Sequence, residues 1–205
     1  LSPIGLRVVE ELNKAGILID VSHAGPRTAM DIISASSEPV VASHSNADSV
    51  CSNPRNLRDE LIIAVACRGG VIGVTAFPSL VRWQEPTLEQ MLDHIDYMVK
   101  NFGAGHVAIG TDVGYQIRDY DDQSTKAQSQ KFRTAFSSLW PKNSFTPEYQ
   151  QDWQKKSLAW TNWPLFTVGL VQRGHSDEDI SKIIGGNVMR VAQAVLPNKP
   201  SFAFR

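Results

Sequence analysis

Apolar runs alternate with amphipathic stretches along the first half of the chain. Short apolar runs are typical of strands covered on both faces, and apolar residues at every third or fourth position are typical of helices. The pattern predicts strands over 17–23, 39–44, 71–77 and 106–112. It predicts a first helix between Ser2 and Gly16, and further helices over 26–36, 57–68 and 88–102.

Capping signals support these helix starts. Ser2 precedes a proline, as at many helix N-termini. Thr87 is followed three positions later by Gln90, which is the spacing of a capping box. Ser176 and Asp179 form a weaker signal of the same kind. The apolar positions expected on the core side of the first helix are Leu6, Val8, Val9 and Leu12.

The alternation of helix and strand predicts an α/β fold with right-handed crossovers and a parallel sheet. Four such βα units are half of a TIM-type (β/α)8 barrel, although four parallel strands also form open sheets. A nucleotide-binding sheet is not indicated, because no G-x-G-x-x-G motif follows the first strand and no phosphate-binding P-loop occurs.

The second half of the chain has a different pattern. Residues 113–158 are polar and weakly periodic, and we interpret them as an insertion over the strand ends. Two helices are expected after it, over about 159–174 and 177–196. We therefore expect a single half-barrel domain over 1–196 and a C-terminal tail over 197–205.

Composition narrows the function classes. The 205 residues suffice for one domain with a core, and 20 Lys and Arg against 21 Asp and Glu argue against a general nucleic-acid binder. Two cysteines do not form a disulfide framework, and no apolar run reaches membrane-spanning length. Signals upstream of Leu1 are not visible, so the location stays open, with the cytoplasm favoured.

Two histidines, His23 and His44, close the first two predicted strands. If these strands are parallel neighbours, the imidazoles lie side by side at their carboxyl ends, where α/β folds place active sites. Paired neutral imidazoles suit a divalent metal. A single histidine at a strand end is more often a surface or core residue with one hydrogen bond, but two in the same context favour a metal site.

Asp112 ends the fourth predicted strand at the same edge. It could bind metal or move a proton, and it could instead order a loop or cap a helix. Arg55 lies in the loop after the second strand, where its planar guanidinium suits a substrate carboxylate, although most loop arginines are surface residues. We expect a structural role for Asp20, with hydrogen bonds in the layer between sheet and helices.

Other polar motifs are less promising. His94-Ile95-Asp96 lies within a predicted helix, where residues two apart point away from each other, and His175-Ser176-Asp177 marks a helix start. Neither is expected to bind metal. No nucleophile elbow surrounds Ser43 or Ser45, so nucleophilic serine catalysis is disfavoured.

Several motifs occur in one order: Leu18-Ile19-Asp20-Val21-Ser22-His23, Pro39-Val40-Val41-Ala42-Ser43-His44-Ser45, Ser49-Val50-Cys51 with Pro54-Arg55-Asn56, Ile109-Gly110-Thr111-Asp112, and Gly185-Gly186-Asn187-Val188-Met189-Arg190-Val191. Together they resemble the membrane (renal) dipeptidase family. The similarity runs from Ser2 to about Val195 and is weakest through 113–158.

The resemblance implies a TIM-type barrel that binds two zinc ions bridged by a carboxylate and hydrolyses dipeptides, some with a D-residue at the carboxyl end. His23 and His44 match the two histidines that hold one zinc. Arg55 matches the arginine that binds the substrate's terminal carboxylate, and Asp112 matches the aspartate that assists proton transfer. Metal-activated water would attack the scissile carbonyl.

The family's H-x-D pair, bridging Glu and substrate-facing His have no match in this chain. The resemblance thus implies about the last four βα units of the barrel plus C-terminal helices. We expect the N-terminal half in cis or as a second chain, and we expect a homo-oligomer. Val113-Gly114-Tyr115 stands where the family usually has Phe-Asp-Gly, and Phe77 where some members have Tyr, so substrate preference stays open.

Two alternatives stay open. One is another amidohydrolase-type barrel enzyme that cleaves a cyclic amide or lactone, which would not need Arg55 as a carboxylate anchor. The other is a catalytically silent binding module of the same fold, which need not bind zinc.

Overall fold

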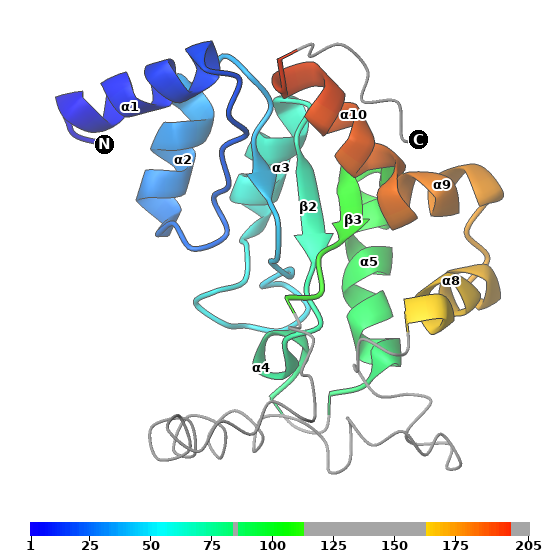
Figure 1. The fold of residues 1–205 in the computed structure, drawn as a ribbon. Helices are drawn as coiled ribbons and strands as arrows, with labels where there is room; N and C mark the ends of the chain where they lie inside the picture. The colour runs from blue at the N-terminus through cyan, green and yellow to red at the C-terminus, as the bar shows by residue number, and fades with distance from the viewer. Residues whose placement is uncertain (84–85, 113–162, 198–205) are drawn as a thin grey trace, which may run out of the picture.

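The computed structural model describes residues 1–83, 86–112 and 163–197. Its centre is a parallel sheet of three strands in the order β1 (Val41–Ala42), β2 (Val71–Val74) and β3 (Val107–Ile109) (Figure 1). The register pairs Ala42 with Ile72, and Ile72 with Val107. The fold class predicted from the sequence, α/β with a parallel sheet, is confirmed for this part of the chain.

The first predicted strand adds to the free side of β1 through a single parallel bridge between Asp20 and Val41. Val21 N donates to Val41 O at 2.8 Å, and Val41 N donates to Ile19 O at 2.9 Å. Regular pairing is shorter than predicted in every strand. In the first two, the chain turns away into loops after Val21 and after Ala42. The prediction of four parallel extended segments is nevertheless correct.

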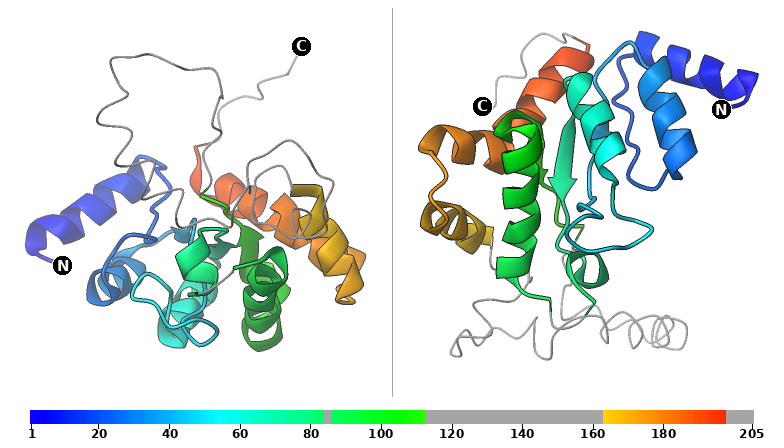
Figure 2. Two further views of the ribbon diagram at one scale, coloured as in Figure 1. Left: turned by 90° about the horizontal axis from the view of Figure 1, so that it is seen from below. Right: turned by 180° about the vertical axis from the view of Figure 1, so that it is seen from behind.

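Helices connect and flank these strands (Figures 1 and 2). The helices before the last strand are α1 (Pro3–Lys14), α2 (Pro26–Ala35), α3 (Asp59–Cys67), α4 (Pro78–Val81) and α5 (Leu88–Phe102), followed by the 3-10 turn η1 (Ala104–His106). The C-terminal elements are α8 (Trp163–Gln172), α9 (Asp177–Ser181), the π-helical turn η3 (Lys182–Gly186) and α10 (Asn187–Val195). No helix among the described residues is long and apolar enough to cross a membrane.

The predicted caps form as expected. Ser2 Oγ accepts a hydrogen bond from Gly5 N at 3.1 Å, and Thr87 N donates to Gln90 Oε1 at 2.7 Å. Ser176 Oγ accepts from Asp179 N at 3.1 Å. The helix expected over 177–196 is interrupted by η3, which contains two consecutive glycines.

One prediction for α1 is wrong. Val9 is buried and Leu12 is half-buried, whereas Leu6 and Val8 are 48% and 50% exposed. Val8 lies about 100° from Val9 around the helix and so lies toward a different side of α1. Helix α1 contacts α2, and Val9 belongs to the same buried cluster as Ala29 and Ile33 of α2.

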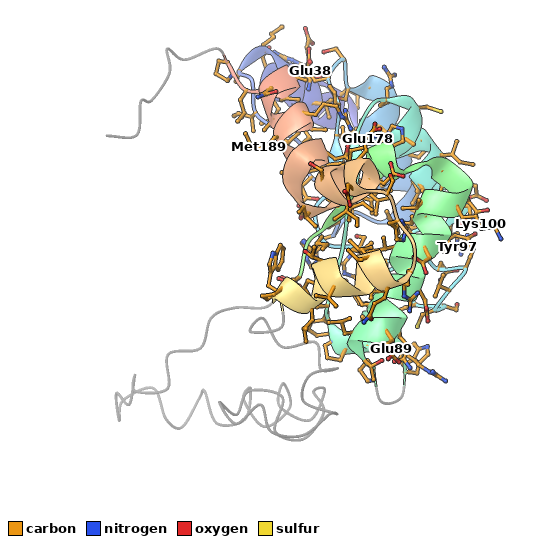
Figure 3. The ribbon with its side chains drawn as sticks, turned by 90° about the vertical axis from the view of Figure 1, so that its right-hand side faces the viewer. Glu38, Glu89, Tyr97, Lys100, Glu178 and Met189 are labelled. Atoms are coloured by element: carbon orange, nitrogen blue, oxygen red, sulfur yellow. The ribbon has the colours of Figure 1, made fainter. Side chains whose placement is uncertain are left out.

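The main core lies between the sheet and the helices α3 and α5, which cover the same face in both views of Figure 2. Ile72 and Val74 of β2 pack there with Ile62 of α3 and Ile95 of α5. The outer side of α5 faces away from the sheet, as Figure 3 shows for Tyr97 and Lys100. Tyr97 OH donates to Asp59 Oδ2 at 2.7 Å and so joins α5 to α3.

The opposite face of the sheet is covered near the strand starts by α10. Its Val191 and Val195 form a second small cluster with Val41, Val71 and Ala108. Arg190 donates to the carbonyl oxygens of Gly69 and Gly105 at 2.6 and 2.8 Å. Asn187 Nδ2 donates to the carbonyl oxygens of Ala104 and Val107 at 2.7 and 2.9 Å. Helix α10 therefore closes the amino-terminal end of the sheet and leaves the carboxyl end to the functional side chains.

The insertion predicted over 113–158 and the tail beyond Pro197 lie outside the described residues.

Candidate functional site

His23 and His44 lie against each other at the carboxyl ends of neighbouring extended segments. Their Nε2 atoms are 2.8 Å apart, and their ring centroids are 4.8 Å apart with an interplanar angle of 55°. His23 is exposed and His44 is half-buried. The prediction that the two imidazoles lie side by side is confirmed, and it follows from the parallel pairing of segment 17–23 with β1.

Arg55 reaches the same point from the loop between β1 and α3. Its Nη2 lies 3.4 Å from His23 Nε2, and its Nη1 donates to the carbonyl oxygen of Ser22. Asn53 supports the loop, since its Oδ1 accepts from Arg55 N at 3.0 Å and its Nδ2 donates to Ser79 O at 3.1 Å. The half-buried Arg55 therefore places its guanidinium beside the imidazole pair.

Asp112 follows β3 at the same carboxyl edge of the sheet, where it is exposed. Its φ of +54° lies in the left-handed region, which Asp tolerates better than most residues. The preceding carbonyl, Thr111 O, accepts from Ala76 N at 3.1 Å and from Thr75 Oγ1 at 3.2 Å, which ties this turn to the chain after β2. Asp112 thus sits on the predicted edge, on a turn with a fixed backbone.

The imidazole pair is not a complete metal site by itself. Among residues 1–83, 86–112 and 163–197, no group of three or more His, Cys, Asp or Glu side chains is arranged to hold a metal ion. In the described residues, His23 and His44 thus supply two nitrogen ligands for a metal, and Asp112 does not add a third ligand beside them.

Asp20 is not where the sequence analysis placed it. It is exposed on the edge of the sheet rather than enclosed between sheet and helices. Its Oδ1 accepts hydrogen bonds from Ser22 N and Ser43 N, both at 3.0 Å, and its Oδ2 accepts from Ser43 Oγ. The correction follows from strand alternation, because Asp20 lies on the opposite face of the strand from Ile19 and Val21, which enter the main core.

Two opposing effects determine the pKa of the Asp20 carboxyl. Partial shielding by the surrounding chain disfavours its charged form, but the hydrogen bonds from Ser43 and Ser22 outweigh this effect, so the pKa of Asp20 lies below its usual value. The group is therefore a carboxylate at neutral pH.

Ser43 links Asp20 to a histidine. Ser43 Oγ lies 2.7 Å from His44 Nδ1, and Ser22 Oγ accepts from His44 N at 3.0 Å. These contacts were missed in the sequence analysis. The signal available there was a serine directly before each histidine, Ser22 before His23 and Ser43 before His44.

The histidines of the two H-x-D motifs make structural contacts. His94 is fully buried, where its Nδ1 accepts from Ala47 N at 3.2 Å and its Nε2 lies 3.0 Å from Val81 O. Burial lowers the pKa of His94, and the hydrogen bond to Val81 and the charge of Asp93 oppose this only in part. His175 Nε2 lies 2.7 Å from Asp96 Oδ1 and so fastens the turn after α8 to α5.

Comparisons with known proteins identify the family to which this chain is similar. Residues 1–128 match the membrane dipeptidase family, peptidase family M19. Dipeptidase verJ of Clonostachys rogersoniana is 30% identical over 95% of this chain and 42% of its own length.

Two solved structures give the same result for the fold. An amidohydrolase from Pseudomonas aeruginosa has a TM-score of 0.71 and 25% identity, over 95% of this chain and 57% of that one. A metallopeptidase from Rhodobacter sphaeroides, liganded with a phosphinate mimic of the dipeptide L-Ala-D-Ala, has a TM-score of 0.68 and 21% identity, over 95% and 47%.

The chain therefore spans about two fifths of the length of the curated relative named above. The family match covers more than half of the chain and includes the paired histidines and Arg55. The chain belongs to the membrane dipeptidase family, peptidase family M19.

Proposed function

We propose that this chain contributes half of the active site of a zinc-dependent dipeptidase. The observation that carries the proposal is the pairing of His23 Nε2 and His44 Nε2 at 2.8 Å, with Arg55 beside them at the carboxyl edge of a parallel sheet. Family membership supports it, as does the name of the relative from Clonostachys rogersoniana, a dipeptidase.

The donor set fits zinc. Neutral imidazole nitrogens are among the ligands that zinc prefers, and here both Nε2 atoms face the same point. Bound there, the metal would lower the pKa of a water molecule and polarise the scissile carbonyl. We assign His23 and His44 as ligands of one zinc of a two-zinc site, whose remaining ligands come from the rest of the protein.

Arg55 is proposed to bind the terminal carboxylate of the dipeptide. A guanidinium beside a cation site needs an anion between them, and a substrate carboxylate supplies it. The contact of Nη1 with Ser22 O fixes the direction of the guanidinium, so that Nη2 stays at the imidazole pair.

Asp112 is proposed as the group that moves a proton from the attacking water to the leaving amine. Asp112 follows β3 and so lies at the same edge of the sheet as the histidines. Because the side chain is exposed, its carboxylate is accessible to the substrate.

The remaining half of the barrel is proposed to lie in cis or on a second chain. Parallel βα units that bear half a metal site, together with coverage of 42% of the relative's length, support a chain that supplies about the last four units of a TIM-type barrel. In the described residues segment 17–23 and β3 form the two edges of the sheet, and each exposes backbone groups to a further strand. A homo-oligomer stays a prediction.

A second candidate is hydrolysis of a cyclic amide or lactone by a barrel of the amidohydrolase type. The similarity to the Pseudomonas aeruginosa amidohydrolase favours it. Such a substrate has no free carboxylate for Arg55, so the two candidates differ in their dependence on that residue.

The test uses the complete protein that contains this chain. Metal content is measured first, and hydrolysis is then followed with L,L- and L,D-dipeptides, L-Ala-D-Ala included, and with a lactone. We expect dipeptide hydrolysis that is lost on chelation and restored by Zn²⁺. A protein that binds no zinc, which is the result expected of a silent binding module, or one that cleaves only the lactone, would contradict the proposal.

A further inference from the structure

One carboxylate, that of Asp20, holds both histidine-bearing segments. Its Oδ1 accepts from the backbone N–H of Ser22, the residue before His23, and from that of Ser43, the residue before His44, both at 3.0 Å. Its Oδ2 accepts from the Ser43 hydroxyl. Three accepted hydrogen bonds therefore hold the Asp20 carboxylate, which is placed to orient the histidines rather than to bind metal itself.

The directions of these hydrogen bonds determine the tautomer of His44. An ionised carboxylate only accepts, so the single hydroxyl proton of Ser43 goes to Asp20. Ser43 Oγ must then accept at its other short contact, 2.7 Å from His44 Nδ1. The proton of the neutral imidazole is consequently on Nδ1, and His44 Nε2, which faces His23, has a free lone pair.

We propose that Asp20 and Ser43 are positioning residues that fix His44 as the Nδ1–H tautomer, the form whose Nε2 can bind zinc. The proposal rests on the proposed function, because it assigns zinc to the His23–His44 pair. It extends that function by two residues that do not touch the metal. Outer hydrogen-bond partners of this kind orient the ring of a ligating histidine and raise its basicity.

The sharpest test is Asp20→Asn, which keeps the size of the side chain. It reverses the direction of the hydrogen bonds that connect residue 20, Ser43 and His44, here called the Asp20–Ser43–His44 relay. The amide Oδ1 can still accept from both backbone N–H groups, but its Nδ2 donates to Ser43 Oγ. Ser43 then donates its proton to His44 Nδ1, and the imidazole proton moves to Nε2. The ¹⁵N shifts of His44 in the zinc-free complete protein, labelled at histidine, report this directly. We expect Nδ1–H in the wild type and Nε2–H in Asp20→Asn.

Zinc affinity gives the second readout. Competition between the protein and a chelator for Zn²⁺ is compared for wild type, Ser43→Ala, Ser43→Thr and the control Ser49→Ala, whose hydroxyl donates to Asp59 at 3.1 Å away from the histidines. Loss of an outer partner typically weakens metal binding by about 10–100-fold. We expect that loss for Ser43→Ala, near-wild-type affinity for Ser43→Thr because the hydroxyl remains, and no change for Ser49→Ala.

The outcomes separate this inference from the proposed function. If the wild type binds zinc and cleaves dipeptides, but Ser43→Ala keeps both its zinc affinity and the Nδ1–H form of His44, the inference is overturned and the proposed function stands. If the wild type does not bind zinc, the proposed function fails, and the inference fails with it. Should Asp20→Asn not fold, Ser43→Ala still decides, because it removes one hydroxyl from an exposed residue.

Discussion

His23 Nε2 lies 2.8 Å from His44 Nε2, although the two residues are 21 positions apart in the sequence. The rings meet because their segments run parallel as neighbours and end at the same edge. Helix α10 closes the other end of the sheet, so this edge is the one available for chemistry (Figure 1).

Replacement of either histidine removes a proposed zinc ligand. We expect His23→Ala or His44→Ala in the complete protein to lower zinc content from two ions to one and to weaken binding of the affected ion by more than about 100-fold, because even loss of an outer partner costs about 10–100-fold. Equilibrium dialysis with Zn²⁺ measures both quantities. His106→Gln, at the opposite end of the sheet, is the control and should retain both ions. Unchanged stoichiometry in His44→Ala would refute the assignment.

Arg55→Ala should impair dipeptide binding. Hydrogen bonds to charged groups contribute about 1.5–3 kcal/mol, so KM for a dipeptide should rise by about 10–100-fold while kcat changes less. Arg55→Lys should be intermediate, since lysine keeps the charge and loses the planar fork.

A dipeptide amide, which lacks the terminal carboxylate, is the matched substrate for this variant. Its hydrolysis should be slow in the wild type and insensitive to Arg55→Ala. Equal losses on the acid and on the amide would show that Arg55 does not recognise the carboxylate.

Gly73 and Gly110 allow the backbone of Ser43 to lie close over the sheet. A Cβ at either position would overlap the carbonyl oxygen of Ser43 well inside van der Waals contact, and a backbone atom cannot move aside as a flexible side chain can. We expect Gly73→Ala and Gly110→Ala to destabilise the protein by about 1–3 kcal/mol, as overpacking usually does, and to weaken zinc binding by displacing His44.

Gly105→Ala is the control for these variants, because its Cβ would meet nothing within 4 Å. Urea denaturation measures the stability of all three variants, and chelator competition measures their zinc affinity. Wild-type stability and zinc affinity in both Gly73→Ala and Gly110→Ala would contradict the close approach of these glycines to Ser43.

His94 should make stability depend on pH. Burial lowers its pKa in the folded state, so the unfolded chain takes up a proton at a higher pH than the folded one. Stability should therefore fall as pH drops below 6.5, the ordinary value for histidine, with a slope of up to about 1.4 kcal/mol per pH unit from this group. Protonation would also abolish the acceptor at Nδ1 that binds Ala47 N.

His94→Gln tests this, because glutamine can donate to Val81 O and does not titrate. Urea unfolding at pH 7.5 and pH 5.5 should show a smaller loss of stability in the variant than in the wild type. The same loss in both proteins would assign the pH dependence to other groups.

The sequence was sufficient to predict a parallel sheet and the meeting of the two histidines. Both depend on coarse features, namely buried apolar runs, intervening helices and the rule that parallel strands end at one edge. The position of Arg55 was predicted less directly. Its loop could be assigned to the correct edge, but the contact with Ser22 O depends on the fold of the loop around Asn53.

The Asp20–Ser43–His44 relay could not be predicted, because it depends on the register between two segments that pair through a single bridge. A shift of one residue would place Asp20 against a different partner. Helix α4 was missed for another reason, since Pro78–Val81 is too short to show a helical period. Leu6 and Val8 are exposed. An apolar residue in a helix is therefore buried only when another element packs against the side of the helix on which it lies.

The most direct test of the central claim is a crystal structure of the complete protein grown with Zn²⁺, with anomalous data collected at the zinc edge. We expect a zinc ion bound to both His23 Nε2 and His44 Nε2 at about 2.0–2.1 Å, with the other ligands from outside this chain's described residues. Anomalous density elsewhere in the protein, with these two nitrogens bonded only to each other, would contradict it.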